Sequence, residues 1–454
     1  MFTWKGNKLI IQVNDRNKVV LKPREIFLLR QLMIHGVMQS RSIYDFLKAA
    51  SSEPLKSNVI NNRLKRLIDT KIINVSKEKL TDKWNTNTRY HYTLGDWGVG
   101  ILVFSKYISI EKGEKILKES RQRTFPKPNE ATASILANEI LIKFLFDERN
   151  NANDFSHQQA FSHPWIKEMG WFDGKIKNWP YSPDWIFESD AIFVCLITNT
   201  NISSAQQMDS VVERYVTLAK IAKSGGKKFN LVFTMIDESI RILPDDKIKN
   251  VNRKIAHLKQ IVSPLQYWVA DMGIYILPAK RTVQLITGLI EPEISQYNNS
   301  NDFPHIFFPN IDLYRFKFNI LQKNHPLYKL KDGVIKADEV VRLKLKDDER
   351  YIAIITGIEG SVVTYERARG MIQRLSKLQN TNISLWIVYP EAEHASFDIL
   401  NLTPLIRVWA TDYETWQMEA RQEGHFPKML SIGKNHRKSR QAYYESLKGR
   451  FSDD

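Results

Sequence analysis

The sequence predicts an α/β multidomain protein that begins with a winged helix-turn-helix and continues with two similar α/β domains. Three observations support this fold class. Helical periodicity in the first hundred residues ends in a β-hairpin pattern, apolar strands alternate with amphipathic helices after residue 131, and the alternation recurs farther along the chain. Because such alternation is typical of sheets covered by helices, and recurrence is typical of duplication, we expect an internally duplicated α/β part.

The positive charge of the chain is concentrated near its N-terminus. The chain has 454 residues and a formal net charge of +16. Residues 1–100 carry 18 Lys and Arg against 8 Asp and Glu, and residues 431–454 carry 6 against 3. Basic side chains favour a polyanionic partner because binding releases counterions from its phosphates. We therefore expect a DNA-binding domain over 1–100 and a basic C-terminal tail over 431–454.

Cysteine content and hydropathy narrow the class of protein further. The single cysteine, Cys195, excludes a disulfide framework within one chain and a cysteine-based metal site. The N-terminal residues show no signal-peptide pattern, and no uncharged run is long enough to cross a bilayer. The sequence therefore predicts a cytoplasmic protein without a membrane partner.

Local patterns predict each element of the N-terminal domain. Two β-rich runs around a polar tetrapeptide indicate a hairpin over residues 9–21. Pro23 opens a helix at a position where its missing N–H costs nothing, and Ser40 caps a second helix over 41–50. A third helix is expected from Lys56 to Thr70, followed by strands at 71–75 and 88–94 with a wing loop at 76–87 between them. This order is that of a winged helix-turn-helix.

The third helix and the wing supply the candidate DNA-binding residues. The apolar residues Val59, Leu64, Leu67 and Ile68 predict an inward face. On the opposite face, Asn and Arg side chains suit base edges and Lys suits phosphates. The candidates are Lys56, Asn58, Asn61, Asn62, Arg63, Lys65 and Arg66 on the helix, and Lys77, Lys79, Lys83 and Arg89 around the wing. A protein-docking role for the same domain is the alternative.

The rest of the chain predicts a basic linker over 101–130, α/β domains over 131–300 and 301–430, and the tail. A helix is expected over 131–148. The first repeat of strand and helix is expected at strands 190–200, 227–237 and 273–279 with helices 203–224 and 249–262. The second is expected at strands 349–357, 382–391 and 406–414 with a helix over 364–378 and a short helix before the last strand. Asp184 and Asp338, like Leu231 and Leu385, lie 154 residues apart, and Glu213-Arg214 lies 153 residues before Glu366-Arg367.

Each repeat resembles the PD-(D/E)xK nucleases, in which an Asp precedes a strand that carries a carboxylate and a lysine one residue apart. Such carboxylates hold Mg²⁺, which activates water for hydrolysis. Pro183-Asp184 fits this pattern, and Asp338 takes its place in the second repeat. The strands that follow offer no acid or lysine at 195–199 or 354–357. We therefore expect no catalytic residue, no metal ligand and no cofactor.

Two single acids have separate interpretations. Asp184 is expected to serve as a turn or capping residue, because one carboxylate holds Mg²⁺ poorly. Glu359 is the acid that an altered arrangement of the second repeat would bring into a site.

Several segments resemble the replication-relaxation family of Gram-positive plasmids and conjugative elements, over roughly residues 20–240. They are the winged-helix segments 63–73 and 89–95, then Leu136-Ala137-Asn138-Glu139-Ile140-Leu141, Pro183-Asp184-Trp185-Ile186-Phe187-Glu188, the strand 191–198 and Val212-Glu213-Arg214-Tyr215. The resemblance implies a DNA-binding accessory factor in plasmid replication, maintenance or transfer. Where the family carries an acid pair, this chain has Leu196-Ile197-Thr198.

The sequence thus favours a non-enzymatic, double-stranded-DNA-binding protein of a plasmid or other mobile element. Its inactive nuclease-like (pseudo-nuclease) domains would serve dimerisation, DNA contact or docking of replication or transfer proteins. Homodimerisation stays open. Two alternatives remain: a metal-dependent DNA endonuclease with a rearranged active site, and a transcription regulator whose α/β part senses a ligand.

Overall fold

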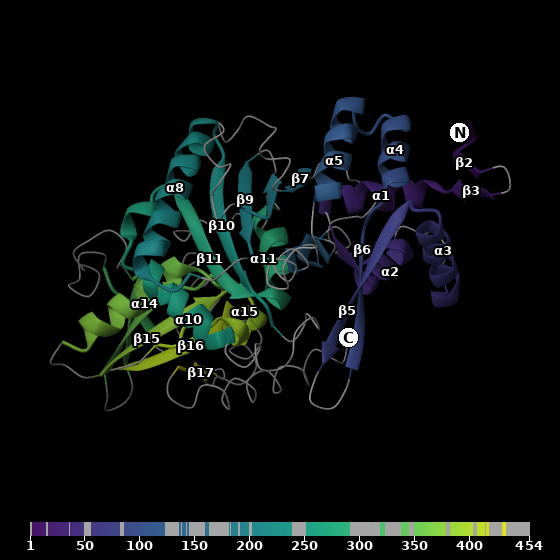
Figure 1. Ribbon diagram of the computed structural model, residues 1–454. Helices are drawn as coiled ribbons and strands as arrows, with labels where there is room; N and C mark the ends of the chain where they lie inside the picture. The colour runs from purple at the N-terminus through teal and green to yellow at the C-terminus, as the bar shows by residue number, and fades with distance from the viewer. Residues whose placement is uncertain are drawn as a thin grey trace. The chain divides into compact units, whose positions relative to one another are not determined.

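The protein is a mixed α/β chain that divides into two compact units (Figure 1). Unit 1 comprises Met1–Ile186 with Ile240–Asp246, and unit 2 comprises Phe187–Ser239 with Lys247–Asp454. The computed structural model describes residues 2–14, 17–35, 37–49, 56–81, 86–122, 136–137, 139–141, 143–144, 159–162, 181, 183–188, 191–198, 202–237, 251–290, 318–322, 337–344, 349–377, 382–402, 406–413, 415–416 and 429–432.

Unit 1 opens with an antiparallel sheet and continues with helices around a second, small sheet. The first sheet has the order β1-β2-β3, and its β2–β3 pair confirms the hairpin predicted over 9–21. The second has the order β4-β6-β5. The strands are β1 (Phe2–Lys5), β2 (Lys8–Asn14), β3 (Asn17–Leu21), β4 (Met38–Gln39), β5 (Ile73–Thr81) and β6 (Thr86–Leu94). The helices are α1 (Pro23–His35), α2 (Ser40–Ala49), α3 (Ser57–Asp69), α4 (Asp96–Phe104) and α5 (Ile110–Gln122).

One apolar core joins the helices and both sheets of this part of unit 1. It includes Leu9 of β2, Leu29 of α1, Phe46 of α2 and Leu64 of α3. The inward face of α3 differs from the prediction at one position, because Val59 is 48% exposed and Ile60 is buried in its place. Ile60, Leu64 and Leu67 follow the spacing i, i+4 and i+7, which puts all three on one side of a helix.

The structure corrects two predicted boundaries in unit 1. Residues 101–104 and 110–122 of the expected basic linker belong to α4 and α5. Ile101 of α4 and Ile108 of the turn between the two helices are buried in the core of this unit, whereas 123–130 lie outside the described residues. The expected wing loop over 76–87 is mainly strand, because β5 and β6 pair in register from Ile73 with Leu94 to Thr81 with Thr86.

The described residues of 136–144 are helical, as the sequence predicts, but they fall within unit 1. There the Ser42 hydroxyl of α2 donates a hydrogen bond to the Glu139 carboxylate.

Strands β9 to β11 and their helices form the first half of unit 2. These strands belong to a five-stranded sheet with the order β11-β10-β9-β8-β7, in which β9, β10 and β11 are parallel. Strand β7 and the first two residues of β8 are assigned to unit 1. Helices α8 and α10 cover one face of its parallel strands, and α11 covers the other (Figure 1). The strands are β7 (Gln159–Ser162), β8 (Trp185–Glu188), β9 (Ile192–Ile197), β10 (Lys228–Met235) and β11 (Met272–Pro278). The helices are α8 (Ala205–Ser224), α10 (Val251–Val262), the 3₁₀ turn η2 (Gln266–Trp268) and α11 (Ala279–Ile290).

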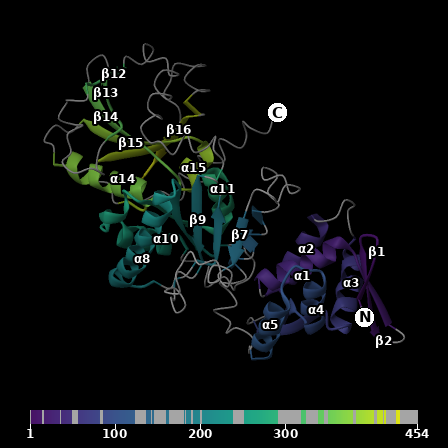
Figure 2. The same cartoon turned by 90° about the horizontal axis from the view of Figure 1, so that it is seen from above.

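A six-stranded sheet forms the second half of unit 2. Its order is β12-β13-β14-β15-β16-β17, with β14, β15 and β16 parallel and the outer pairs antiparallel. The strands are β12 (Phe318–Ile320), β13 (Glu339–Lys344), β14 (Glu349–Thr356), β15 (Ile383–Tyr389), β16 (Arg407–Asp412) and β17 (Leu430–Ser431), with helices α14 (Val362–Leu375) and α15 (Ala392–Phe397). Figure 2 shows α14 beside α10, and α15 beside α11.

The two halves share the same strand order. Their equivalent positions, however, are not separated by one constant number of residues. In each half, two neighbouring parallel strands are joined by a segment that contains a helix. Cys195 pairs with Leu231 in the first half, and Ala353 pairs with Leu385 in the second. The paired residues are therefore four positions farther apart along the chain in the first half. Glu213 lies nine residues after the cap Ser204, whereas Glu366 lies five residues after the cap Ser361. The two Glu-Arg pairs therefore occupy different helix positions.

No helix in the described ranges has the length and apolar character that crossing a membrane requires.

Candidate nucleic-acid interface

Helix α3 has one buried side and one exposed side. Lys56 precedes its first turn in an extended conformation without a side-chain cap, and the first turn contains no acidic residue. At the other end the Thr70 hydroxyl donates to the Arg66 carbonyl at 2.8 Å, and Lys71 has a φ of 56°. The helix dipole makes the N-terminal end of α3 partially positive.

The outer side of α3 carries exposed polar side chains. Asn61, Asn62 and Lys65 are exposed, and none of the three has a hydrogen bond or ion pair among the described residues. The side-chain oxygen Oδ1 of Asn58, by contrast, accepts from the Val59 N–H at 2.8 Å. Asn58, Asn62 and Lys65 follow the spacing that places residues on one helix face. This face therefore offers amides and an ammonium group to a ligand.

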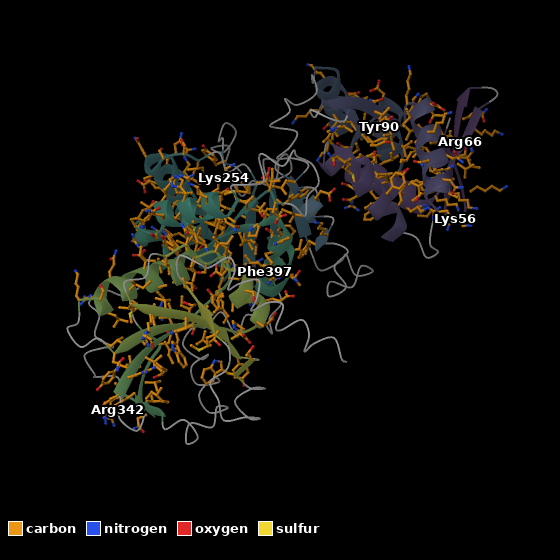
Figure 3. The ribbon with its side chains drawn as sticks, turned by 90° about the horizontal axis from the view of Figure 1, so that it is seen from below. Lys56, Arg66, Tyr90, Lys254, Arg342 and Phe397 are labelled. Carbon is orange, nitrogen blue, oxygen red and sulfur yellow. The ribbon has the colours of Figure 1, made fainter. Side chains whose placement is uncertain are left out.

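Two of the predicted DNA-binding arginines form hydrogen bonds with other elements of unit 1. Arg63 donates to the Glu25 carboxylate of α1 at 2.8 Å and to the Val20 carbonyl of β3. Glu25 is buried and also accepts from the Lys22 N–H at 2.6 Å. Arg66 donates to the Lys18 carbonyl of β3 at 2.7 Å. Both guanidinium groups thus fasten α3 to preceding elements, while Figure 3 shows where Lys56 and Arg66 lie on this unit.

We predict that Arg63→Ala lowers the free energy of unfolding of unit 1 by about 1–3 kcal/mol, between the values for exposed and buried ion pairs. The reason is that Glu25 would stay buried without its cation. Urea unfolding of the full chain measures the change. Lys65→Ala on the same helix is the matched control, and equal stability of the two variants would contradict a structural role for Arg63.

The wing candidates are placed only through their backbone. Lys77 and Lys79 lie in β5 opposite Tyr90 and Thr88, and Arg89 lies in β6 opposite Glu78. The side chains of these three candidates, and all of Lys83, lie outside the described residues. Tyr90 is exposed on the hairpin and is labelled in Figure 3.

One basic residue beside α3 is absent from the sequence-based candidates. Lys18 of β3 is exposed, and its carbonyl accepts from Arg66. The two residues are separated by 48 positions. Because no local pattern links a strand residue to a helix that far along the chain, only the tertiary structure brings Lys18 to this surface.

The acids considered for a nuclease site interact with other groups of the chain. Asp338 accepts from the Thr356 N–H and from the Arg367 guanidinium, each at 2.6 Å. Glu359 accepts from Arg281 through both carboxylate oxygens, at 2.8–3.1 Å. Burial raises the pKa of the Glu359 carboxyl above its ordinary value, while Arg281 acts in the opposite direction. Asp184 is partly buried just before β8.

Asp338 and Glu359 are therefore each paired with an arginine. Lys259 and Asp398 form a further buried pair at 2.7 Å. Within the described ranges, no three acidic, histidine or cysteine side chains are grouped so that they could hold a metal ion.

Comparisons with models of known families, with curated proteins and with solved structures find no match to this chain. The resemblance to the replication-relaxation family accordingly stays a prediction from the sequence.

Proposed function

We propose that unit 1 contains a winged helix-turn-helix that binds double-stranded DNA, with α3 as the helix that enters the major groove. The order of three helices and a β-hairpin supports this assignment. The observation that carries the proposal is the exposed outer face of α3, where Asn61, Asn62 and Lys65 have no partner among the residues that the structure describes. Asn pairs with the adenine edge and Lys with phosphate or guanine, so this face suits a duplex.

We propose in addition that the two α/β halves are a duplicated, catalytically inactive nuclease-like pair. Their common strand order supports duplication. The ion pairs of Asp338 and Glu359 support inactivity, because a carboxylate already neutralised by a guanidinium is a poor ligand for Mg²⁺. The resemblance noted in the sequence supports a role at the DNA of a plasmid or other mobile element.

Selection from a random duplex library, followed by footprinting of the selected sequence and of DNA from the protein's own locus, tests the DNA-binding proposal. We expect one enriched motif and a protected site. We also expect the logarithm of affinity to fall with the logarithm of salt concentration, by about 0.9 for each phosphate that the protein neutralises.

Uniform weak binding to all duplexes would reject a sequence-specific role. Absence of binding at low salt would reject DNA as the partner and favour a protein-docking function for unit 1.

A further inference from the structure

The outer face of α5 carries four exposed charged residues in a fixed order. The inner face packs against the core through Gly113, Ile116 and Leu117. A Cβ on Gly113 would lie 2.6 Å from the Val103 side chain of α4, which shows how closely the two helices approach. Facing away from this contact are Glu111, Glu114, Lys115 and Lys118. The acids thus lie in the first half of the described face and the lysines in the second.

These four charges have no ion-pair partner among the described residues of the unit. Glu111 and Lys115, like Glu114 and Lys118, are four residues apart, a spacing that permits ion pairs along one helix. Over the part of the chain that the structure describes, none of the four side chains has an ion-pair partner. Their charges therefore remain available to a partner molecule.

Two copies of α5 placed antiparallel would bring opposite charges face to face. A twofold axis between residues 114 and 115 would bring Glu114 opposite Lys115 of the partner subunit. The same axis would bring Glu111 opposite Lys118 of the partner subunit. One axis thus satisfies both kinds of pair, and each pair occurs twice in a symmetric dimer.

An apolar patch of three exposed side chains comes just before this charged face in the sequence. Phe104, Tyr107 and Ile110, which lie at or between the end of α4 and the start of α5, are 40%, 49% and 68% exposed. Phe104 packs on Phe2 with ring centroids 5.1 Å apart, and Arg30 lies 5.6 Å from the Tyr107 ring centroid. These contacts hold the two aromatic side chains in place, so the patch is preformed.

We propose that this surface, defined by Phe104, Tyr107, Ile110 and the four charged residues of α5, binds a second copy of the chain with the two α5 helices antiparallel. The apolar residues would supply desolvated contact area at the ends of the helix pair, where Ile110 meets the aliphatic part of Lys118 of the partner subunit. The charges would fix the orientation, because a parallel arrangement would place like charges together.

The dimer has a consequence that rests on the proposed function. Each subunit would present one α3, so a twofold dimer would recognise two half-sites in inverted orientation. The motif selected from a random library should then be an inverted repeat, whereas a monomer would select a single asymmetric half-site.

Charge-reversed variants of the full chain test the dimer without DNA. Variant A carries Glu111→Lys and Glu114→Lys, and variant B carries Lys115→Glu and Lys118→Glu. In either homodimer all facing charges repel, but an equal mixture of A and B restores every pair. Sedimentation equilibrium compares each species with the monomer mass of 53.0 kDa.

We expect wild type and the A–B mixture to sediment at twice the monomer mass at micromolar concentration. Variants A and B alone should dissociate at least about tenfold more readily. The control variant carries Lys220→Glu and Lys254→Glu, which make the same charge change as B at exposed positions of unit 2; it should stay dimeric. Circular dichroism checks that each variant is folded.

Three results would overturn the proposal: a monomeric wild type, dimers of A and B alone as stable as wild type, or folded A and B that do not associate when mixed. A wild-type dimer that selects no DNA motif would leave the interface standing and reject only the DNA-binding function.

Discussion

Lys259→Met is expected to lower the free energy of unfolding of unit 2 by about 3–5 kcal/mol, the usual cost of removing one member of a buried ion pair. The Lys259 ammonium of α10 lies 2.7 Å from the Asp398 carboxylate, and the two side chains are 0% and 1% exposed. Asp398 also accepts from the Gly360 N–H at 3.1 Å and from the Tyr389 hydroxyl at 2.7 Å. Methionine matches the aliphatic part of lysine in length and flexibility, so the variant removes the cation with little change in packing.

Urea unfolding of the full chain measures this effect, and a second substitution isolates its cause. Asp398→Asn keeps a carbonyl that can accept from Gly360 but removes the negative charge. We therefore expect the double variant Lys259→Met with Asp398→Asn to be more stable than Lys259→Met alone.

The matched control is Lys254→Met on the same helix, where the side chain is exposed (Figure 3). It should change stability by no more than about 0.5 kcal/mol. If Lys259→Met behaved like this control, the buried pair would have no role in holding unit 2 together.

The Lys259–Asp398 ion pair is one of several contacts that join the two halves of unit 2. Lys259 and Arg281 come from helices of the first half, and their acids Asp398 and Glu359 come from the second half. Arg281 also donates to Glu393 at 2.6 Å and lies 4.9 Å from the Phe397 ring centroid. The Ile276 N–H at the edge of the five-stranded sheet donates to the Gly360 carbonyl at 2.9 Å. The junction is thus asymmetric in charge, with cations on one side and anions on the other.

Lys65→Ala and Asn62→Ala are expected to weaken DNA binding in two distinguishable ways. Lys65 is suited to a phosphate, so its loss should lower affinity for every duplex and reduce the salt slope by about one. Asn62 is suited to a base edge, so its loss should cost about 1–3 kcal/mol on the selected motif and little on other duplexes. Neither side chain has an intramolecular partner among the described residues, so neither variant should unfold the domain.

Titration of the selected duplex and of a scrambled duplex, at several salt concentrations, measures both effects. Lys220→Ala, at an exposed position of α8 in unit 2, is the matched control for loss of one positive charge. Arg66→Ala is expected to change stability together with affinity, because Arg66 also donates to the Lys18 carbonyl. Unchanged binding in Lys65→Ala and Asn62→Ala would exclude the outer face of α3 as the DNA contact.

Local pattern predicted most helices and parallel strands of this chain. The helices over 203–224 and 249–262, and the strands over 227–237 and 382–391, are confirmed with boundaries shifted by only a few residues. The sequence does not predict β12 and β17, because three and two residues are too few to show an alternating pattern, and it does not predict β13 either. The sequence pattern also does not predict the length of the helix that connects two parallel strands. The matching Glu-Arg pairs therefore suggest equivalent helix positions in the two halves, which the positions of the caps Ser204 and Ser361 contradict.

The sequence by itself determined the mixed α/β class, the position of α3 and the basic character of the first hundred residues, because periodicity and charge are local properties. Only the tertiary structure decided which polar side chains form hydrogen bonds or ion pairs. Arg63 and Glu25 are 38 residues apart, and Lys259 and Asp398 are 139 residues apart. Whether a charged side chain is paired or free depends on contacts between distant segments, and these contacts form only when the apolar faces of the helices and strands are buried together.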